Sequence, residues 1–283
     1  MPPNSEKATR HLLAIPGTDI ALPYTQIDGD AKGPTLLITG GVHGGEYPGI
    51  EAAIRFANAL DPSRLRGRVY VIHLTNPPAF YGKSQYYVPL DGKNLNRVFP
   101  GSALGSVSER MAHRVSELAR TSDFWVDMHG GDIHEALVPF TIYSDGGSPE
   151  VVAQSRQMAE AYGIARILES SSVAGGTYAF AATVGIPAIL TESGQMGQLD
   201  EEAVQVHLRG LENILRAGKC GATMRVAMTT SPQIIQAHRG APMRSFGFIR
   251  NRSLPNVPTA TEANFASRSR SDDRGCVDLG VRQ

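Results

Sequence analysis

The chain has 283 residues, enough for one large domain or for a domain with a small appendage. Its 27 basic and 27 acidic side chains balance, so no net charge attracts nucleic acid or an anionic membrane. Two cysteines, Cys220 and Cys276, are too few for a disulfide framework or a cysteine metal cage. No signal-peptide pattern and no run of eighteen apolar residues occurs, so we expect a cytoplasmic protein without a membrane partner.

Short apolar runs alternate with helical patterns through the first 220 residues. In chain order we expect a strand at 35–39, a helix at 47–60, a strand at 68–74, a helix at 106–120, strands at 124–128 and 140–143, a helix at 149–162, a strand at 166–169, a helix at 177–184, a strand at 188–191 and a helix at 200–217. The strands do not alternate polar and apolar residues, which indicates a sheet covered on both faces. The pattern therefore predicts an α/β sandwich.

The composition changes near residue 230. Residues 231–283 contain eight arginines, four acidic residues and no lysine. A basic segment can bind nucleic acid, but these arginines are not interleaved with aromatic residues, so we favour a poorly ordered tail. We divide the chain into a catalytic domain, 1–222, and a second segment, 223–283, in which only 223–229 has the pattern of a strand.

Two polar clusters follow predicted strands directly. The first is GGVHGGE, which contains His43 and Glu46, and the second is VDMHGGD, which contains Asp127 and His129. Open α/β sheets bind ligands at the carboxyl ends of their strands. Two imidazoles and one carboxylate with an open fourth position are the donors of a catalytic zinc site. We therefore predict one Zn²⁺ held by His43, Glu46 and His129, with Asp127 as a supporting carboxylate.

Two further motifs offer groups for catalysis and substrate binding. Glu192 follows the predicted strand AILT, where a carboxylate can take a proton from water and pass it to a leaving amine. Asn96 and Arg97 combine an amide with a planar cation, a pair suited to binding a carboxylate. We predict that Glu192 is catalytic and that Asn96 and Arg97 bind substrate.

Each motif also has a structural explanation when taken alone. The His-x-x-Glu spacing occurs by chance, His129 can be a core histidine, Glu192 can pair at a sheet edge, and the Asn-Arg pair can form a turn with a salt bridge. The recurrence of polar groups at strand ends in an α/β order favours the metal site. His73, His113 and His207 lie within predicted strands or helices and receive no role. His134 and Glu135 follow the third ligand, where support of the ligands or contact with substrate is an alternative that we do not adopt.

Taken together, the motifs resemble the succinylglutamate desuccinylase/aspartoacylase family: HGGE at 43–46, DGKNLNRVFPG at 91–101, DMHGGD at 127–132 and TESG at 191–194. The resemblance implies a zinc carboxypeptidase-like fold with a mixed, mostly parallel sheet sandwiched by helices. It also implies the same three zinc ligands, a general base at Glu192 and a substrate carboxylate at Asn96 and Arg97. The glycine-rich motifs look most like the branch that contains N-acetyl-diaminobutyrate deacetylases.

The sequence departs from the family pattern in two places. Pro89 stands seven positions before Asn96, where members that deacylate acetylaspartate carry an arginine. The partner of the oxyanion is therefore open, with the zinc ion as one candidate. Family members usually continue into a β-rich domain, whereas residues 223–283 read as a truncated or irregular remnant of such a domain.

These features predict a zinc-dependent hydrolase that cleaves the amide bond of an N-acyl amino acid or a similar small amide. Two rivals stay open: a zinc carboxypeptidase or peptide amidase with the same site, and an inactive metal-binding relative. The expected partner is a small-molecule substrate and not a nucleic acid, and the sequence is compatible with a homo-oligomer. The acyl group and the preferred amino acid are not encoded in the motifs.

Overall fold

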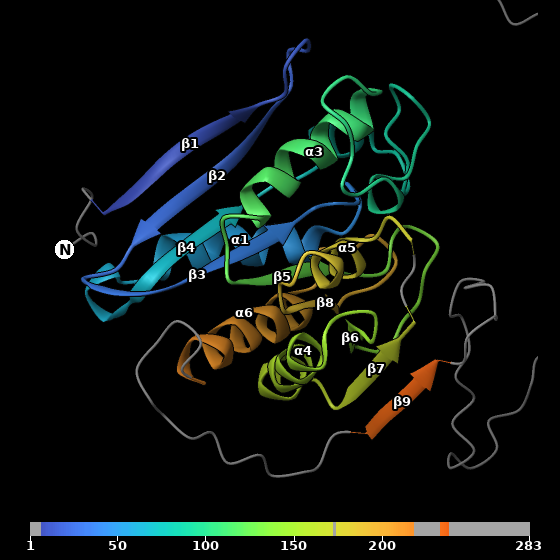
Figure 1. Ribbon diagram of the computed structural model, residues 1–283. Coiled ribbons are helices and arrows are strands. Elements are labelled where there is room, and N and C mark those ends of the chain that lie inside the picture. Colours follow the sequence, from blue (N-terminus) through green and yellow to red (C-terminus); the bar gives the residue numbers. More distant parts are fainter. Residues whose placement is uncertain (1–6, 172–173, 218–232, 238–283) are drawn as a thin grey trace, which may run out of the picture. The chain divides into compact units, whose positions relative to one another are not determined.

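The computed structural model describes residues 7–171, residues 174–217 and the backbone of residues 233–237 (Figure 1). Within these residues nine strands form one sheet in the order β1-β2-β4-β3-β5-β8-β6-β7-β9. The strands are β1 (Ala8–Ala14), β2 (Ala21–Asp28), β3 (Ala31–Gly40), β4 (Arg66–Ile72), β5 (Phe124–His129), β6 (Phe140–Ser144), β7 (Arg166–Ser170), β8 (Ala188–Glu192) and β9 (Gln233–Ala237). The helices are α1 (Tyr47–Ala59), α2 (Pro77–Gly82), α3 (Val107–Ala119), α4 (Pro149–Tyr162), α5 (Thr177–Thr183) and α6 (Glu201–Arg216), with 3-10 turns at Pro62–Arg64 and Leu95–Arg97.

The sheet is mixed and mostly parallel, as the sequence predicts. Strands β4, β3, β5 and β8 run parallel to one another in the centre, and β6, β7 and β9 form a second parallel group. Antiparallel pairs join the two groups at β8 and β6 and attach β2 and β1 to β4. The parallel centre brings the carboxyl ends of β3, β5 and β8 to one edge.

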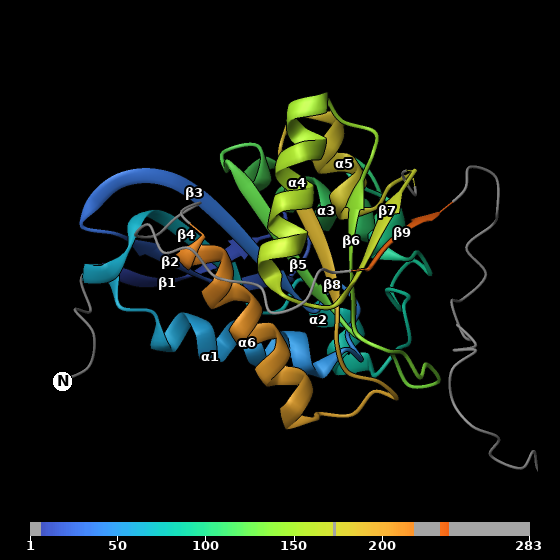
Figure 2. The ribbon, with the colours of Figure 1, turned by 90° about the horizontal axis from the view of Figure 1, so that it is seen from below.

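Two apolar cores fill the space between the sheet and its helices. On one face, side chains of α3 and α5 such as Met111 and Phe180 pack with Trp125 and Leu37 of the sheet. On the other face, α1, α4 and α6 cover a second core that contains Val126 of β5. Helices α1 and α6 lie side by side in Figure 2. Both faces of the central strands are therefore buried, which explains their continuous apolar runs.

The helices begin where the sequence provides starting signals. The Ser106 N–H donates to the Glu109 carboxylate over 2.8 Å at the start of α3, in a capping-box sequence. The Asp200 side chain accepts from the backbone N–H groups of Glu202 and Ala203 at the start of α6. These local signals are the reason that both helices could be predicted.

The strands and helices predicted between residues 35 and 217 are all present, and their ends differ by a few residues. Strands β1 and β2 and the short helix α2 were not predicted. Strand β1 is mostly exposed at the sheet edge, so it lacks the apolar run by which buried strands are found. The expectation of no strand beyond residue 229 is wrong for β9, which pairs with β7. The predicted strand at 223–229 lies outside the described residues, and the division into 1–222 and 223–283 stays a prediction.

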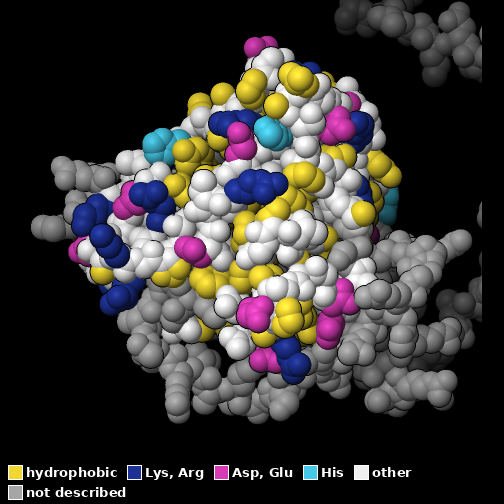
Figure 3. Space-filling model, viewed as in Figure 1, with side chains coloured by type: hydrophobic (Ala, Val, Ile, Leu, Met, Phe, Trp, Pro, Cys, Tyr) yellow, Lys and Arg dark blue, Asp and Glu magenta, His cyan; other side chains and the backbone are white. Residues whose placement is uncertain are grey.

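None of the helices within the described residues is long and apolar enough to cross a membrane. On the face shown in Figure 3, acidic and basic side chains lie interspersed, with apolar side chains between them.

Candidate active site

The predicted site residues come from adjacent strand ends. In the sheet, Gly40 at the end of β3 pairs with Met128 of β5, and His129 of β5 pairs with Glu192 of β8. His43 and Glu46 follow β3 by a few residues. The structure therefore gathers these four side chains at the carboxyl edge of three parallel strands, where α/β sheets bind ligands.

A glycine-rich turn directs His43 and Glu46 toward β5. Gly41 has a φ of +68°, and a Cβ on Gly44 would lie 2.2 Å from the backbone nitrogen of Phe80. The Asn76 side-chain amide donates to the Val42 carbonyl over 3.0 Å and fixes the turn from the neighbouring loop. Since glycine alone permits this approach and readily adopts this backbone, Gly41 and Gly44 of the GGVHGGE segment are required by the geometry.

The side chains of His43, Glu46 and His129 converge on one point. Each offers one ligand atom, and these atoms lie within 4.8 Å of one another. The Glu46 carboxylate is 2.6 Å from His43 Nδ1 and 2.8 Å from His129 Nδ1. Its Oε2 atom is buried and lacks a well-aligned hydrogen bond. The three residues are 7%, 2% and 1% exposed, respectively, so the convergence is buried.

The far nitrogens of both imidazoles are already held by oxygen atoms. His129 Nε2 lies 2.8 Å from Asp127 Oδ2, and His43 Nε2 lies 3.1 Å from Asn94 Oδ1. Each ring therefore donates its Nε2–H outward and aims Nδ1 at Glu46. Two Nδ1 lone pairs and a carboxylate around one point require a cation, either protons or a metal ion, and the set fits a metal such as Zn²⁺.

Asp127 supports His129 and also accepts hydrogen bonds from two other segments. Its Oδ1 accepts from the Thr39 hydroxyl of β3, and its Oδ2 accepts from the Thr177 hydroxyl at the start of α5, both over 2.6 Å. Trp125 Nε1 in turn donates to Thr39 over 2.9 Å. This network is buried, so it fixes the carboxylate that orients His129.

The electrostatics of the cluster reflect these contacts. Burial alone would raise the pKa of Glu46, but His43 and His129 outweigh it and lower this pKa to about 2. Burial lowers the pKa of His129, but the carboxylates of Asp127 and Glu46 outweigh it and raise this pKa well above its usual range. Without a metal ion, the buried cluster therefore binds a proton at neutral pH.

Glu192 lies beside His129 across the β5–β8 pair. Its Oε2 atom is buried and has no hydrogen-bond partner. Burial raises the pKa of Glu192 well above its usual range, and the Glu46 carboxylate adds to the rise, while His129 opposes it. A carboxyl group that is easily protonated and lies next to the ligand cluster has the properties of a general acid or base.

Asn96 and Arg97 lie on the 3-10 turn at Leu95–Arg97, directly after Asn94. Asn96 is 4% exposed, and its Oδ1 accepts from the backbone N–H of Thr177 over 2.9 Å. Arg97 is exposed, and its Nη1 donates to the Asn96 carbonyl over 2.7 Å. Arg97 therefore keeps donors for a ligand. The Asn96 amide oxygen is already engaged, so a ligand would contact the amide nitrogen of Asn96.

Sequence reasoning missed two residues that support the cluster. Asn94 stands two positions before Asn96, and only its contact with His43 marks it out. His207 was set aside because it lies on a helix, but its Nε2 bonds to the His129 carbonyl over 3.0 Å. Its Nδ1 lies 3.0 Å from the Tyr162 hydroxyl, and burial lowers the pKa of His207 to about 4. His207 is thus neutral and fixes the end of β5 through its bond to the His129 carbonyl.

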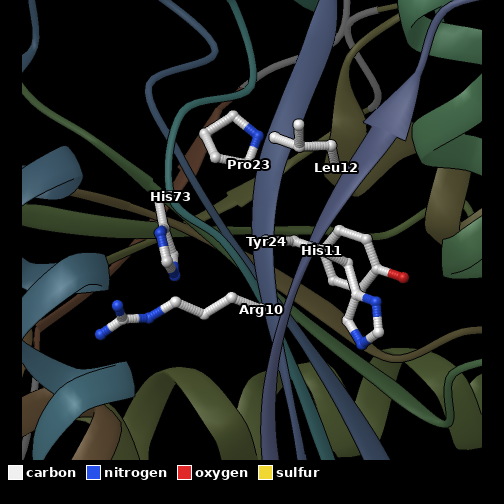
Figure 4. Close-up of a pocket in the computed structure, with 6 residues that line it drawn as sticks. All are labelled: Arg10, His11, Leu12, Pro23, Tyr24 and His73. Carbon is white, nitrogen blue, oxygen red and sulfur yellow. The ribbon is translucent and has the colours of Figure 1, made fainter.

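A separate hollow of about 290 Å³ lies on the outer strands (Figure 4). None of the predicted site residues lines it, and its lining residues come from β1, β2 and the end of β4: Arg10, His11, Leu12, Pro23, Tyr24 and His73. The rings of His11 and Tyr24 stack with centroids 5.0 Å apart. Burial and Arg10 lower the pKa of His73 to about 4, so this histidine is neutral at pH 7. No carboxylate is among these lining residues, in contrast to the cluster of His43, Glu46 and His129.

The model of the succinylglutamate desuccinylase/aspartoacylase catalytic domain matches residues 32–217, which is more than half of the chain. The chain belongs to this family. It is 32% identical over 211 residues to an N-alpha-acetyl-L-2,4-diaminobutyric acid deacetylase from Halomonas elongata. That match covers 69% of this chain and 58% of the relative, so the chain spans less than two thirds of the relative's length.

Solved structures of the family share the fold. The product-bound ectoine utilization protein EutE of Ruegeria pomeroyi superposes with a TM-score of 0.75 at 25% identity, covering 84% of this chain and 74% of that protein. An aspartoacylase family protein of Mesorhizobium loti gives a TM-score of 0.68 at 28% identity, covering 84% of this chain and 72% of that one. These likenesses confirm the family and the carboxypeptidase-like fold that the motifs predict.

Proposed function

We propose that the protein is a zinc-dependent hydrolase that cleaves the amide bond of an N-acyl amino acid. The observation that carries this proposal is the convergence of His43, Glu46 and His129 beside Glu192. Membership of a deacylase family supports amide hydrolysis. The name of the Halomonas relative makes N-α-acetyl-2,4-diaminobutyrate the first substrate to test.

The donor set fits Zn²⁺ because two imidazole nitrogens and one carboxylate leave a position open for water or substrate. When bound, such an ion lowers the pKa of a water ligand to about 7 and polarises a carbonyl group. His43, Glu46 and His129 would hold the ion. Asn94 and Asp127 would keep the two rings oriented through their Nε2–H groups.

Glu192 would move the proton. Its carboxylate would accept a proton from the attacking water as the water oxygen bonds to the carbonyl carbon. The protonated form would then deliver this proton to the nitrogen as the carbon–nitrogen bond breaks, releasing a carboxylate and an amine. The raised pKa of Glu192 supports this role, since it makes the carboxylate a stronger base toward water than an ordinary glutamate.

Arg97 and Asn96 would orient the substrate through its carboxylate. The exposed guanidinium of Arg97 offers a charged, planar donor, and Asn96 is fixed by its bond to Thr177. Orientation of this kind lowers the entropic part of the barrier. The zinc ion as partner of the oxyanion, in place of an arginine at the position of Pro89, stays a prediction, as do cytoplasmic residence and a homo-oligomeric state.

The test is a panel of N-acyl amino acids assayed with the zinc-loaded protein. We expect hydrolysis of at least one of them, loss of activity after dialysis against a chelator, and recovery when Zn²⁺ is added. Glu192→Gln should retain zinc but lower kcat by about 10²–10⁴-fold, since it removes the proton carrier. Near-normal turnover by this variant would refute the role of Glu192. Cleavage of peptides with free C-termini, without cleavage of N-acyl amino acids, would instead favour a carboxypeptidase.

A further inference from the structure

Glu135 lies on the loop that follows β5, and hydrogen bonds attach this loop to the one that follows β8. The Met196 N–H donates to the Glu135 carbonyl over 2.8 Å. Gly131 donates to the Gly194 carbonyl over 2.9 Å and accepts from Gly197 over 3.1 Å. The loop after β5 is therefore bonded to the loop after β8. Strand β5 ends at His129 and strand β8 ends at Glu192. These bonds hold the backbone of Glu135 in one place beside the site.

Tyr86 connects Glu135 to a proposed metal ligand. Its ring meets the ring of His43 edge to face, with centroids 5.5 Å apart at 85°. The Glu135 carboxylate lies near enough to the Tyr86 hydroxyl to act on it electrostatically. The backbone N–H of Tyr86 donates to the buried Asp132 carboxylate over 3.1 Å, at a φ of +56°. Tyr86 is thus fixed between His43 and the loop that carries Glu135.

The Glu135 carboxylate has acceptor capacity that its protein contacts do not use. Its Oε2 accepts from the Asp132 N–H over a long 3.3 Å, and the Tyr86 hydroxyl lies near it. A carboxylate has about four acceptor positions. None of the ion pairs that lysine or arginine forms within the described residues involves Glu135. Glu135 is only partly buried, so a ligand can reach its charge.

We propose that Glu135 and the Tyr86 hydroxyl bind an ammonium group of the substrate and so select acylated amino acids with a cationic side chain. This inference rests on the proposed deacylase function. An ammonium group has three donors, which fit the free carboxylate positions of Glu135 and the oxygen lone pairs of Tyr86. Arg97 would then bind the negative end of the substrate and Glu135 the positive end. The second amine of a diaminobutyrate derivative is a ligand of this kind.

The test compares two substrates that differ in one charge, N-α-acetyl-2,4-diaminobutyrate and N-acetyl-2-aminobutyrate. Glu135→Gln keeps an oxygen that can accept from Asp132 and Tyr86 but removes the charge. We expect it to lower kcat/KM for the cationic substrate by about tenfold or more. The neutral substrate should change by less than about threefold. Glu117→Gln on α3, which removes an exposed ion-pair partner of Arg114, is the matched control and should change neither value.

Binding of the products separates failure of this inference from failure of the proposed function. The wild type should bind 2,4-diaminobutyrate about tenfold more tightly than 2-aminobutyrate in calorimetry, and Glu135→Gln should abolish this difference. An equal effect of the variant on both compounds, or no effect, would overturn the role of Glu135. If neither acetylated compound is hydrolysed, the deacylase proposal fails, and the binding difference still decides whether Glu135 recognises the ammonium group.

Discussion

His129 and Glu192 are positioned by a β-ladder, whereas His43 and Glu46 are positioned by a glycine-rich turn. His129 and Glu192 are paired residues of β5 and β8 in the centre of the sheet, so the strand register sets their spacing. His43 and Glu46 depend on close backbone packing against α2 and on the bond from the Asn76 side chain at its start. One part of the site is thus fixed by regular structure and the other by a turn that tolerates little change.

The two imidazoles also differ in the group that supports them. His129 bonds to the buried carboxylate of Asp127, and His43 bonds to the neutral amide of Asn94. A charged acceptor makes an imidazole a more basic ligand than a neutral acceptor does. We therefore expect His129, on the strand, to contribute more to metal affinity than His43, on the turn. We also expect a change in the partner of His43 to alter that affinity. The following substitutions test this difference.

Removal of a ligand should have the largest effect. His129→Ala and His43→Ala should each lower Zn²⁺ affinity by about 10³-fold or more, because a site with two ligands binds zinc poorly. The larger loss of Zn²⁺ affinity should come from His129→Ala. Competition with a chromogenic chelator measures both affinities. His113→Ala, on the partly exposed side of α3, is the control, and zinc binding by His129→Ala at wild-type strength would contradict the ligand assignment.

Removal of the charge behind His129 should have the next largest effect. Asp127→Asn replaces one acceptor oxygen by an NH₂ group. Either the Thr39 hydroxyl, or the Thr177 hydroxyl together with the His129 ring, would then lose its acceptor. We expect a loss of about 10–100-fold in zinc affinity, measured by the same competition. Asp61→Asn, at the exposed cap of a 3-10 turn, should leave the affinity unchanged. A wild-type affinity in Asp127→Asn would show that this carboxylate does not tune the site.

Zinc affinity should rise with pH by about tenfold per unit. The carboxylates around His129 raise its pKa, so the metal-free cluster holds a proton at neutral pH that zinc must displace. Because the proton competes with the metal, affinity is lost as the pH falls and gained as it rises. Calorimetry in two buffers of different ionisation enthalpy, between about pH 6 and 8, measures the protons released. No proton release over this range would argue against the protonated cluster.

A charged partner for His43 should have the smallest effect, in the opposite direction. Asn94→Asp gives His43 the kind of acceptor that His129 already has and keeps the bond from the Asn96 N–H. We expect zinc to bind about two- to tenfold more tightly. Asn58→Asp, at an exposed position bonded to Arg10, is the matched control. Weaker binding in Asn94→Asp would mean that the difference between the two supports does not set affinity.

The strand part of the site could be predicted from the sequence because it depends on regular structure. The apolar runs before His129 and Glu192 identify adjacent buried strands, and their carboxyl ends share an edge. Strands β1 and β2 escaped prediction because edge strands with mixed polarity lack that signal. The support from Asn94, the brace from His207 and the link from Tyr86 to Glu135 depend on contacts between distant segments. Spacing along the chain carries no trace of such contacts.

The central claim is that two imidazoles and one carboxylate bind a single metal ion. Zinc K-edge X-ray absorption on the zinc-loaded full-length chain tests it most directly. We expect one zinc per chain with two imidazole nitrogens and one or more oxygens at about 2.0–2.2 Å, and a changed spectrum with loss of one imidazole in His129→Ala. Sulfur ligands at about 2.3 Å, or an identical spectrum from His129→Ala, would contradict it.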